Sequence, residues 1–462
     1  MSETQALPRF SAPAGEIIGW RDGDVLRATN IPYARARRFQ PPERLTRCET
    51  PIEATHWAPA SPQRTMQAFT RLLGASPNNM AQQEDCTRLS ICLPARPATT
   101  PRPVMVWIHG GSYVFGAGDL PIHDPKPLVS EQDVVTVSIT YRLGIFGFVG
   151  GTFQGKTNQE EAKAQGATGD RPANLGLLDM IAALRWISDN IATFGGDPDN
   201  VTLFGESAGG DAIAHLMTAD ETRGLFHRAI LQSAPLGITP GRHGMHTAMA
   251  RAAESLNERS SLKACLDAQH RVEKIGQRYL PGGLMPFGVQ FGQPPLPPLD
   301  QRHAALEKRA PHCDLLIGHN VDEAELFMPE VEPLQGLFGL PVIGARLRSG
   351  LSQRITRHLY SRPAERFARR HAEAGGCVWR YRLNWGSGRA ARGACHSIDL
   401  ALLFAGWAEW QHAGIVEGMT EQELERSGCQ LRALWARFAR GGTLEDEGAI
   451  EGVVEWERVT PS

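Results

Sequence analysis

The sequence contains little lysine and no excess of positive charge. Only six of its 462 residues are lysine, and 48 Lys+Arg stand against 50 Asp+Glu, which gives a formal net charge of −2. A dedicated nucleic-acid-binding protein normally carries a basic excess. The charge balance therefore argues against nucleic acid as a partner.

Long apolar runs are absent as well. No apolar stretch approaches the roughly 18 residues that a helix needs to cross a bilayer. Residues 1–8 contain neither the basic segment nor the apolar segment of a secretory signal. We therefore expect a cytoplasmic protein that makes no membrane contact.

Paired cysteine motifs are also missing. The cysteines form no CxxC pair and no metal-type spacing with histidine, and they lie scattered at Cys48, Cys86, Cys92, Cys265, Cys313, Cys377, Cys395 and Cys429. This pattern predicts reduced, mostly buried thiols. We expect no metal ion and no organic cofactor.

What the sequence does contain is typical of a large globular enzyme. A hydrophobic fraction of 42% and a charged fraction of 21% exclude a disordered chain and a disulfide-stapled miniprotein. Short β-branched runs alternate with a helical pattern, which predicts a mostly parallel α/β sheet flanked by helices. We find no internal repeat and no linker, so the simplest prediction is one domain over residues 1–462. The predicted strands are 104–108, 134–140, 201–204 and 315–317, with a helix inside 174–194.

Two stretches lack periodicity and are rich in glycine or proline. Residues 150–171 are polar and are predicted to form a long surface loop. Residues 280–300 are predicted to be irregular and to cover the sheet. We expect both stretches to border the mouth of a site.

A serine lies between two glycines in Gly205-Glu206-Ser207-Ala208-Gly209, between a predicted strand and a predicted helix. This is the pattern of a nucleophile elbow, in which a tight turn exposes the serine hydroxyl above the sheet. Cβ atoms at positions 205 and 209 would clash in such a turn. The sequence therefore predicts Ser207 as a nucleophile.

The residues around the elbow carry a family resemblance. Asn174-Leu-Gly-Leu-Leu-Asp179, Phe194-Gly-Gly-Asp-Pro198 and the segment 201–210 closely resemble the type-B carboxylesterases, which include cholinesterases and bacterial p-nitrobenzyl-type esterases. Further matches extend over nearly the whole chain. The resemblance implies an α/β-hydrolase fold with loop and helical insertions covering the site. It also implies ester hydrolysis through an acyl-enzyme.

A serine nucleophile needs a base and an acid, which follow it along the chain in this fold. The resemblance of segment 318–323 to the family's acid motif implies Glu323 as the acid, with Asp322 as its competitor. The resemblance of segment 396–404 implies His396 as the base. His319 and His215 are the rival histidines, but neither has the expected position after the acid.

Acyl transfer also requires hydrogen-bond donors aimed at the oxyanion. His109-Gly110-Gly111-Ser112-Tyr113 follows a predicted strand and resembles the family's oxyanion loop. The resemblance implies the backbone N–H groups of Gly111, Ser112 and Ala208 as donors, although relatives usually have Gly or Ala where this chain has Ser112. It also implies that Glu206 lies near the histidine and favours the imidazolium.

Two departures from the family bear on the substrate. Cys86 is present, but Ser61 stands where secreted animal relatives have its disulfide partner, so we expect no disulfide. Residues 74–89 contain no aromatic side chain, which argues against a cation–π site for a quaternary ammonium and against cholinesterase activity.

These features together predict hydrolysis of small to medium neutral esters, with water as the second substrate. Carbamates, amides and bulky natural-product esters remain alternative substrates. A non-catalytic adhesion or scaffold protein of the same fold is the alternative from another class. Monomer and homodimer are equally compatible with the sequence.

Overall fold

The computed structural model describes residues 7–151, 171–238, 241–328, 336, 338, 340 and 344–461. The loop predicted over 150–171 falls outside the described residues except at its ends. Within the described ranges, no helix combines the length and the apolar character that crossing a bilayer requires.

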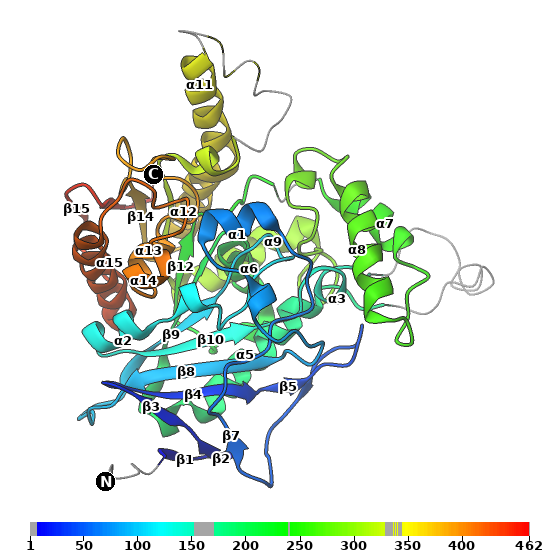
Figure 1. Ribbon diagram of the computed structural model, residues 1–462, viewed down its shortest axis with the longest axis vertical. Coiled ribbons are helices and arrows are strands. Elements are labelled where there is room, and N and C mark those ends of the chain that lie inside the picture. The colour runs from blue at the N-terminus through cyan, green and yellow to red at the C-terminus, as the bar shows by residue number, and fades with distance from the viewer. Residues whose placement is uncertain are drawn as a thin grey trace.

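A large mixed sheet of eleven strands runs through the described part of the molecule (Figure 1). Six neighbouring strands in the middle of the sheet are parallel to one another, and the outer strands on both sides are antiparallel. This is the mostly parallel sheet that the sequence predicts. In spatial order the strands are β15 (Glu447–Ile450), β16 (Val454–Arg458), β14 (Val378–Leu383), β13 (Asp314–Asn320), β12 (Arg228–Gln232), β11 (Gly196–Glu206), β9 (Arg102–Ile108), β10 (Val135–Thr140), β8 (Arg88–Pro94), β4 (Val25–Pro32) and β3 (Trp20–Asp22).

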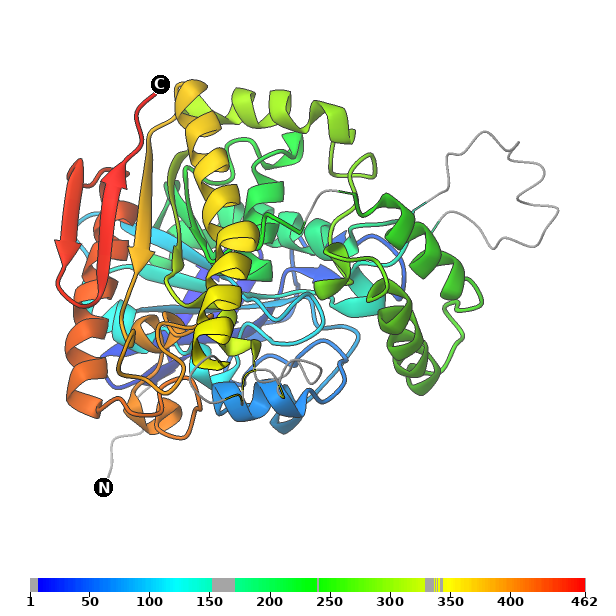
Figure 2. The ribbon, with the colours of Figure 1, turned by 90° about the horizontal axis from the view of Figure 1, so that it is seen from above.

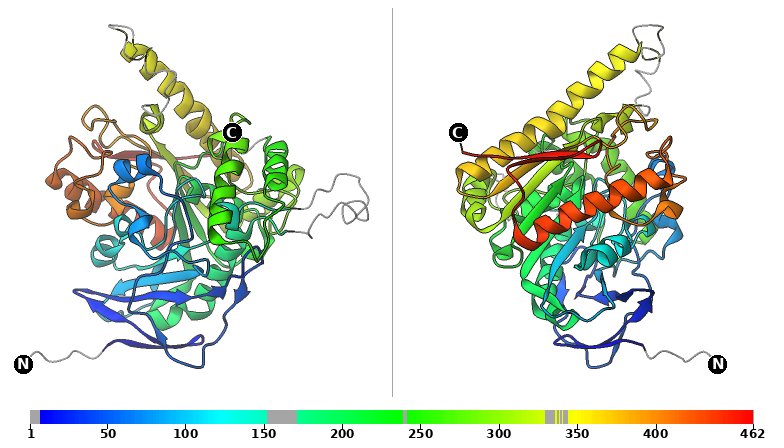
Figure 3. Two further views of the ribbon diagram at one scale, coloured as in Figure 1. Left: turned by 45° about the vertical axis from the view of Figure 1, so that its right-hand side comes forward. Right: turned by 90° about the vertical axis from the view of Figure 1, so that its left-hand side faces the viewer.

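Helices cover both faces of this sheet. On one face α2 (Lys126–Gln132) and α15 (Glu421–Gly441) pack against each other, and α5 (Leu175–Asn190), α6 (Ala208–Leu216) and α12 (Arg362–Glu373) lie on the opposite face (Figure 3). Figure 2 shows α12 lying along β13 and β14. The remaining described helices are α1 (Gln67–Leu73), α3 (Gly144–Gly147), α7 (His243–Ala252), α8 (Leu262–Gly276), α9 (Arg302–Arg309), α11 (Gly344–Thr356), α13 (Leu400–Leu403) and α14 (Trp407–Trp410).

Local sequence explains the central elements. The last five residues of β9 are all buried, because a central parallel strand is covered by helices on both faces. On α5, the buried Asp179 accepts hydrogen bonds from Arg142 Nη2 at 2.6 Å and Nε at 2.8 Å. Both side chains are at most 2% exposed, so each charge compensates the other inside the core. This ion pair fixes α5 to the segment that follows β10.

Three parallel strands end at the same edge of the sheet: β9 before His109, β11 before Ser207, and β13 before the segment that contains Glu323. Parallel strands bring their carboxyl ends together, and this is where open α/β sheets bind ligands. The fold therefore gathers the predicted site residues although they lie far apart in the sequence.

The proline-rich stretch 280–300 is irregular, as expected, and hydrogen bonds from residues far away in the sequence hold it in place. The side chain of Asn174, at the start of α5, donates to the carbonyl oxygens of Gln290 and Gln293 and accepts from the N–H of Gln290. Arg242 donates to the carbonyl of Phe287. These anchors hold the stretch beside α5 and α7, and none of its residues lines the cavity that contains Ser207. That the stretch borders the mouth of the site stays a prediction.

Candidate active site

Ser207 occupies a strained turn between β11 and α6. Its backbone angles are φ 56° and ψ −122°, a conformation that non-glycine residues rarely adopt. A Cβ at Gly209 would lie 2.0 Å from the carbonyl oxygen of Ile108, and one at Gly205 would lie 2.8 Å from the carbonyl carbon of Gly209. Only glycine fits at either position, which is the steric requirement that the sequence predicts for this turn.

His396 meets the carboxylate of Glu323. The imidazole Nδ1 lies 2.5 Å from Glu323 Oε2, and the backbone N–H of His396 donates to the carbonyl of Glu323 at 3.3 Å. The other oxygen of Glu323 accepts from the N–H of Asn320 at 2.8 Å. Asp322, the competitor, instead accepts from Ser387 Oγ and from the N–H of Ala394, both at 2.9 Å. Of the two carboxylates, the imidazole therefore contacts Glu323.

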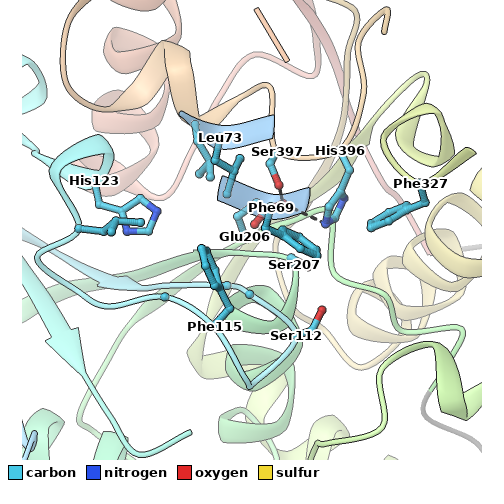
Figure 4. Close-up of a pocket in the computed structure, with 15 residues that line it drawn as sticks. Phe69, Leu73, Ser112, Phe115, His123, Glu206, Ser207, Phe327, His396 and Ser397 are labelled. Carbon is cyan, nitrogen blue, oxygen red and sulfur yellow. Dashed lines mark hydrogen bonds and ion pairs between the residues drawn. The ribbon is translucent and has the colours of Figure 1, made fainter. Parts of the chain in front are cut away.

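Glu206 lies on the other side of the imidazole. Its Oε1 atom is 3.1 Å from His396 Nε2 and accepts a hydrogen bond from Ser397 Oγ at 2.7 Å. Figure 4 shows His396, Ser397 and Glu206 side by side next to Ser207. The His396 ring thus lies between two carboxylates, both of them buried.

This arrangement shifts the protonation of both partners. Burial by itself would lower the pKa of His396, but the negative charges of Glu206 and Glu323 raise it to about 9. Burial raises the pKa of Glu206 to about 7, against the opposing effect of the His396 charge. The geometry therefore stabilises an imidazolium, which is the state that a base reaches after it has taken a proton.

A narrow cavity joins these groups. Ser207, His396, Glu206 and the loop residues Gly110–Ser112 all line it. Its volume is about 30 Å³, which is the space of one or two water molecules. The nucleophile and the base predicted from the sequence thus face one small space (Figure 4).

Two of the three predicted oxyanion donors, Gly111 and Ser112, line the same space, and the third, Ala208, directly follows Ser207. Gly111 has φ 98° and Ser112 has φ 55°, and neither N–H has an intramolecular acceptor within the described part of the chain. The N–H of Ala208 belongs to the first residue of α6, where no intrahelical partner exists. A Cβ at Gly110 would lie 2.6 Å from the carbonyl oxygen of Glu206. This close packing explains why glycine is needed where the loop meets the elbow.

The two rival histidines lie elsewhere. His215 Nδ1 contacts the carbonyl oxygen of Asp211 at 2.6 Å, inside α6. His319 Nδ1 contacts the carbonyl oxygen of Asn320 at 2.9 Å. Neither residue lines the cavity that contains Ser207.

The apolar wall of the cavity was not found from the sequence. We use this name for the side chains of Phe69, Leu73, Phe115, Leu120 and Leu400, which line the cavity. Phe69 and Leu73 belong to α1, where their spacing of four residues is an ordinary helical pattern. No signal in the sequence distinguished them from core residues. His123 and Phe327 also line the cavity, and the ring of Phe327 lies 5.4 Å from that of His396.

Asp399, three residues after His396, anchors the histidine segment. Its carboxylate accepts from Gln232 Nε2 at 2.5 Å and from Asn320 Nδ2 at 3.2 Å, at the ends of β12 and β13. Burial raises the pKa of Asp399. The spacing between His396 and this carboxylate thus reflects attachment of the segment to the sheet.

Cys86 and Ser61 lie together, as the comparison of motifs implies. The buried Cys86 is a free thiol that hydrogen-bonds with the Ser61 side chain, and burial raises its pKa to about 12. Ser61 Oγ also accepts from the N–H of Leu143 at 3.1 Å. A serine side chain therefore lies beside Cys86 where the family resemblance implies a second cysteine in secreted animal relatives. Among the described residues, no group of histidine, cysteine, aspartate and glutamate side chains has the arrangement of a metal site.

Comparison with known proteins agrees with this geometry. The model of the carboxylesterase family matches residues 15–335. The chain is 34% identical to the probable N-octanoylanthranilate hydrolase AqdA2 of Rhodococcus erythropolis, covering 94% of this chain and 93% of that protein. It is 32% identical to the para-nitrobenzyl esterase of Bacillus subtilis, covering 94% and 90%. A solved structure described as a thermophilic PNB esterase superimposes with a TM-score of 0.74 at 29% identity, covering 96% of this chain and 93% of that one.

These matches and the sheet topology define an α/β-hydrolase fold. The chain belongs to the carboxylesterase family, and it is a hydrolase of that family.

Proposed function

We propose that this protein is a serine carboxylic-ester hydrolase that acts on small to medium neutral esters. Ser207 is the nucleophile, His396 the base, and Glu323 the acid that orients the base. The observation that carries the proposal is the position of His396. Its Nδ1 atom is bonded to Glu323, and its ring lines the same cavity as Ser207.

These positions support an acyl-enzyme reaction. His396 removes the proton of the Ser207 hydroxyl while Oγ attacks the ester carbonyl, and the resulting imidazolium is stabilised by Glu323 and Glu206. The tetrahedral intermediate collapses when His396 returns the proton to the leaving alcohol, which leaves an acyl-Ser207 ester. A water molecule, deprotonated by His396, then attacks the acyl group and releases the carboxylic acid and free Ser207.

The N–H groups of Gly111, Ser112 and Ala208 stabilise the negative oxygen of the intermediate. Their value lies in being fixed before the reaction starts, since they need no reorganisation when the charge develops. A side chain at Ser112 leaves its backbone donor in place, so the departure from the usual Gly or Ala does not remove a donor.

The lining of the cavity supports a neutral substrate. Three ionisable side chains line the cavity, those of Glu206, His396 and His123, and all the other lining side chains are apolar or uncharged. Burial lowers the pKa of His123 to about 4, so this imidazole is neutral at pH 7. The small volume and the apolar wall favour short acyl groups.

Replacement of Ser207 by Ala tests the proposal. We expect turnover of p-nitrophenyl acetate and butyrate to fall by about 10⁴-fold or more. Labelling by a fluorophosphonate probe should disappear in the same variant, and the labelled peptide of the wild-type protein should contain Ser207. Unchanged turnover, or labelling at another residue, contradicts the proposal.

Amide hydrolysis is a second candidate activity, because a relative with 34% identity is described as a probable N-octanoylanthranilate hydrolase. An amine is a poor leaving group and must be protonated by the His396 imidazolium before the C–N bond breaks. An ester alkoxide leaves more easily and depends less on this protonation. Matched pairs of p-nitrophenyl esters and p-nitroanilides with the same acyl group distinguish the two. If kcat/KM for the anilide is within tenfold of that for the ester, amide hydrolysis is favoured as the activity of the protein.

We also propose that the protein works in the cytoplasm. All its described cysteines are free thiols, and a reducing compartment keeps thiols in that state. Fractionation of the native host followed by immunoblotting tests the location.

A further inference from the structure

One buried hydrogen bond joins the oxyanion loop to the helix that follows the nucleophile. Tyr113 comes directly after the proposed donors Gly111 and Ser112, and Asp211 lies in the first turn of α6, four residues after Ser207. The Tyr113 hydroxyl donates to Asp211 Oδ2 at 2.7 Å. Tyr113 is 0% exposed and Asp211 is 1% exposed. Water therefore cannot replace either partner.

The loop needs such an anchor because its backbone is strained. Gly111, Ser112 and Tyr113 have φ angles of 98°, 55° and 60°. Non-glycine residues stay in this region only when the surrounding structure holds them there. Backbone bonds close the loop on itself: the N–H groups of Val114 and Phe115 both donate to the carbonyl of Gly111 at 3.0 Å. These local bonds do not attach the loop to Ser207.

Asp211 makes that attachment with two parts of the same residue. Its backbone N–H donates to the carbonyl of Ser207 at 2.9 Å, while its side chain accepts from Tyr113. Its other oxygen, Oδ1, has no partner among the described residues, and His215 Nδ1 lies 3.6 Å from Oδ2. Burial and the charge of Asp211 raise the pKa of Tyr113 well above its usual value. The phenol consequently remains a donor at any working pH.

We propose that Tyr113 and Asp211 are positioning residues that hold the N–H groups of Gly111 and Ser112 at a fixed place relative to Ser207 and Ala208. This inference rests on the proposed function, because the four groups must surround one substrate carbonyl. The hydrogen bond makes the loop and the elbow one rigid unit. Without it the loop can relax, and a displacement of about 1 Å reduces rates by about 10²-fold.

Tyr113→Phe removes only the hydroxyl, and Tyr33→Phe is its matched control. Tyr33 is also 0% exposed, and its hydroxyl donates to the carbonyl of Thr140 at 2.8 Å instead of to a residue of α6. We expect Tyr113→Phe to lower kcat for p-nitrophenyl butyrate by about 10- to 100-fold, with KM within about threefold of wild type. Both variants lose one buried hydrogen bond, so we expect them to lower the melting temperature to a similar extent. Only Tyr113→Phe should lower kcat, and Tyr33→Phe should leave kcat unchanged.

A trifluoromethyl ketone forms a tetrahedral adduct with the serine, so its affinity measures how well the N–H donors stabilise the negative oxygen. Its affinity should fall in Tyr113→Phe by about the same factor as kcat, because both depend on the oxyanion donors. Asp211→Asn keeps an oxygen acceptor and should retain most of the activity, whereas Asp211→Leu should behave like Tyr113→Phe. If Tyr113→Phe does not fold, the contrast between Asp211→Leu and Asp211→Asn in kcat and in ketone affinity serves in its place.

The outcomes separate this inference from the proposed function. If wild-type turnover depends on Ser207 and Tyr113→Phe matches Tyr33→Phe in kcat and in ketone affinity, the positioning role is overturned and the proposed function stands. If Ser207→Ala keeps full turnover, both are overturned.

Discussion

The polar floor of the site and its apolar wall are built in different ways. The floor consists of the turns that hold Ser207, Ser112, Glu323 and His396, with short buried hydrogen bonds and left-handed backbone at both serines. The apolar wall consists of side chains from several elements: Phe69 is only partly buried and lies on the ordinary helix α1, whereas Leu73, Phe115, Leu120 and Leu400 are buried. A strained floor tolerates few replacements, whereas an unstrained wall tolerates many. We therefore expect the chemistry to depend on backbone geometry and the preferred substrate size to depend on side chains.

The largest effect on the floor is expected from Glu323, which is adjacent in the sequence to a second carboxylate, Asp322. Glu323→Gln removes the charge that orients His396, and we expect kcat to fall by about 10³- to 10⁴-fold, because the wrong tautomer or orientation of the base disables proton transfer. Asp322→Asn is the matched control, since Asp322 contacts Ser387 and the N–H of Ala394 instead of the imidazole. Steady-state kinetics with p-nitrophenyl butyrate measures both. Equal losses in the two variants contradict the assignment of Glu323.

A smaller effect is expected from the carboxylate on the other side of the imidazole. The base must be neutral to accept the Ser207 proton, so activity rises with pH through the pKa of His396. Glu206 helps to raise that pKa to about 9. Glu206→Gln removes the negative charge, so the pKa falls and the rising limb of kcat/KM moves to lower pH, by about one unit. The pH profile of kcat/KM measures the shift. A limb that stays in place or moves to higher pH contradicts the electrostatic role of Glu206.

The smallest effect concerns the apolar wall. Phe69→Ala enlarges the cavity without touching Ser207 or His396, so longer chains should fit better while the chemical step is kept. We expect the kcat/KM ratio of hexanoate to acetate p-nitrophenyl esters to rise about tenfold. Leu284→Ala, at an exposed apolar side chain outside the cavity, is the control and should leave the ratio unchanged. A large fall in acetate turnover in Phe69→Ala would show that floor and wall are not separable.

Much of the floor could be predicted from the sequence because its residues lie in short motifs with strict local sterics. The turn around Ser207 admits only glycine at positions 205 and 209, and the sequence has glycine at both. The strands at 104–108, 134–140, 201–204 and 315–317 were each found, with boundaries within five residues of β9, β10, β11 and β13. Asp322 and Glu323 were separated only by the family register, since adjacent residues share one local pattern. The contacts of His396 now distinguish them.

The wall and the place of the 280–300 stretch could not be predicted in this way. Phe69 and Leu73 carry an amphipathic spacing that any half-buried helix shows, and the sequence does not state what that face packs against. The irregular stretch has no periodic pattern that indicates which surface it packs against. Its position depends on Asn174 and Arg242, which lie more than 40 residues from the carbonyls they bind.

By itself, the sequence determined the type of fold, the strained turn at Ser207 and the order of the groups predicted to act. These depend on local sterics and on hydrophobic periodicity, which neighbouring residues fully specify. Only the tertiary structure decided which carboxylate contacts His396, which side chains close the cavity, and how Tyr113 reaches Asp211. Such contacts join residues far apart along the chain, and their geometry is set by the packing of the whole sheet and its helices.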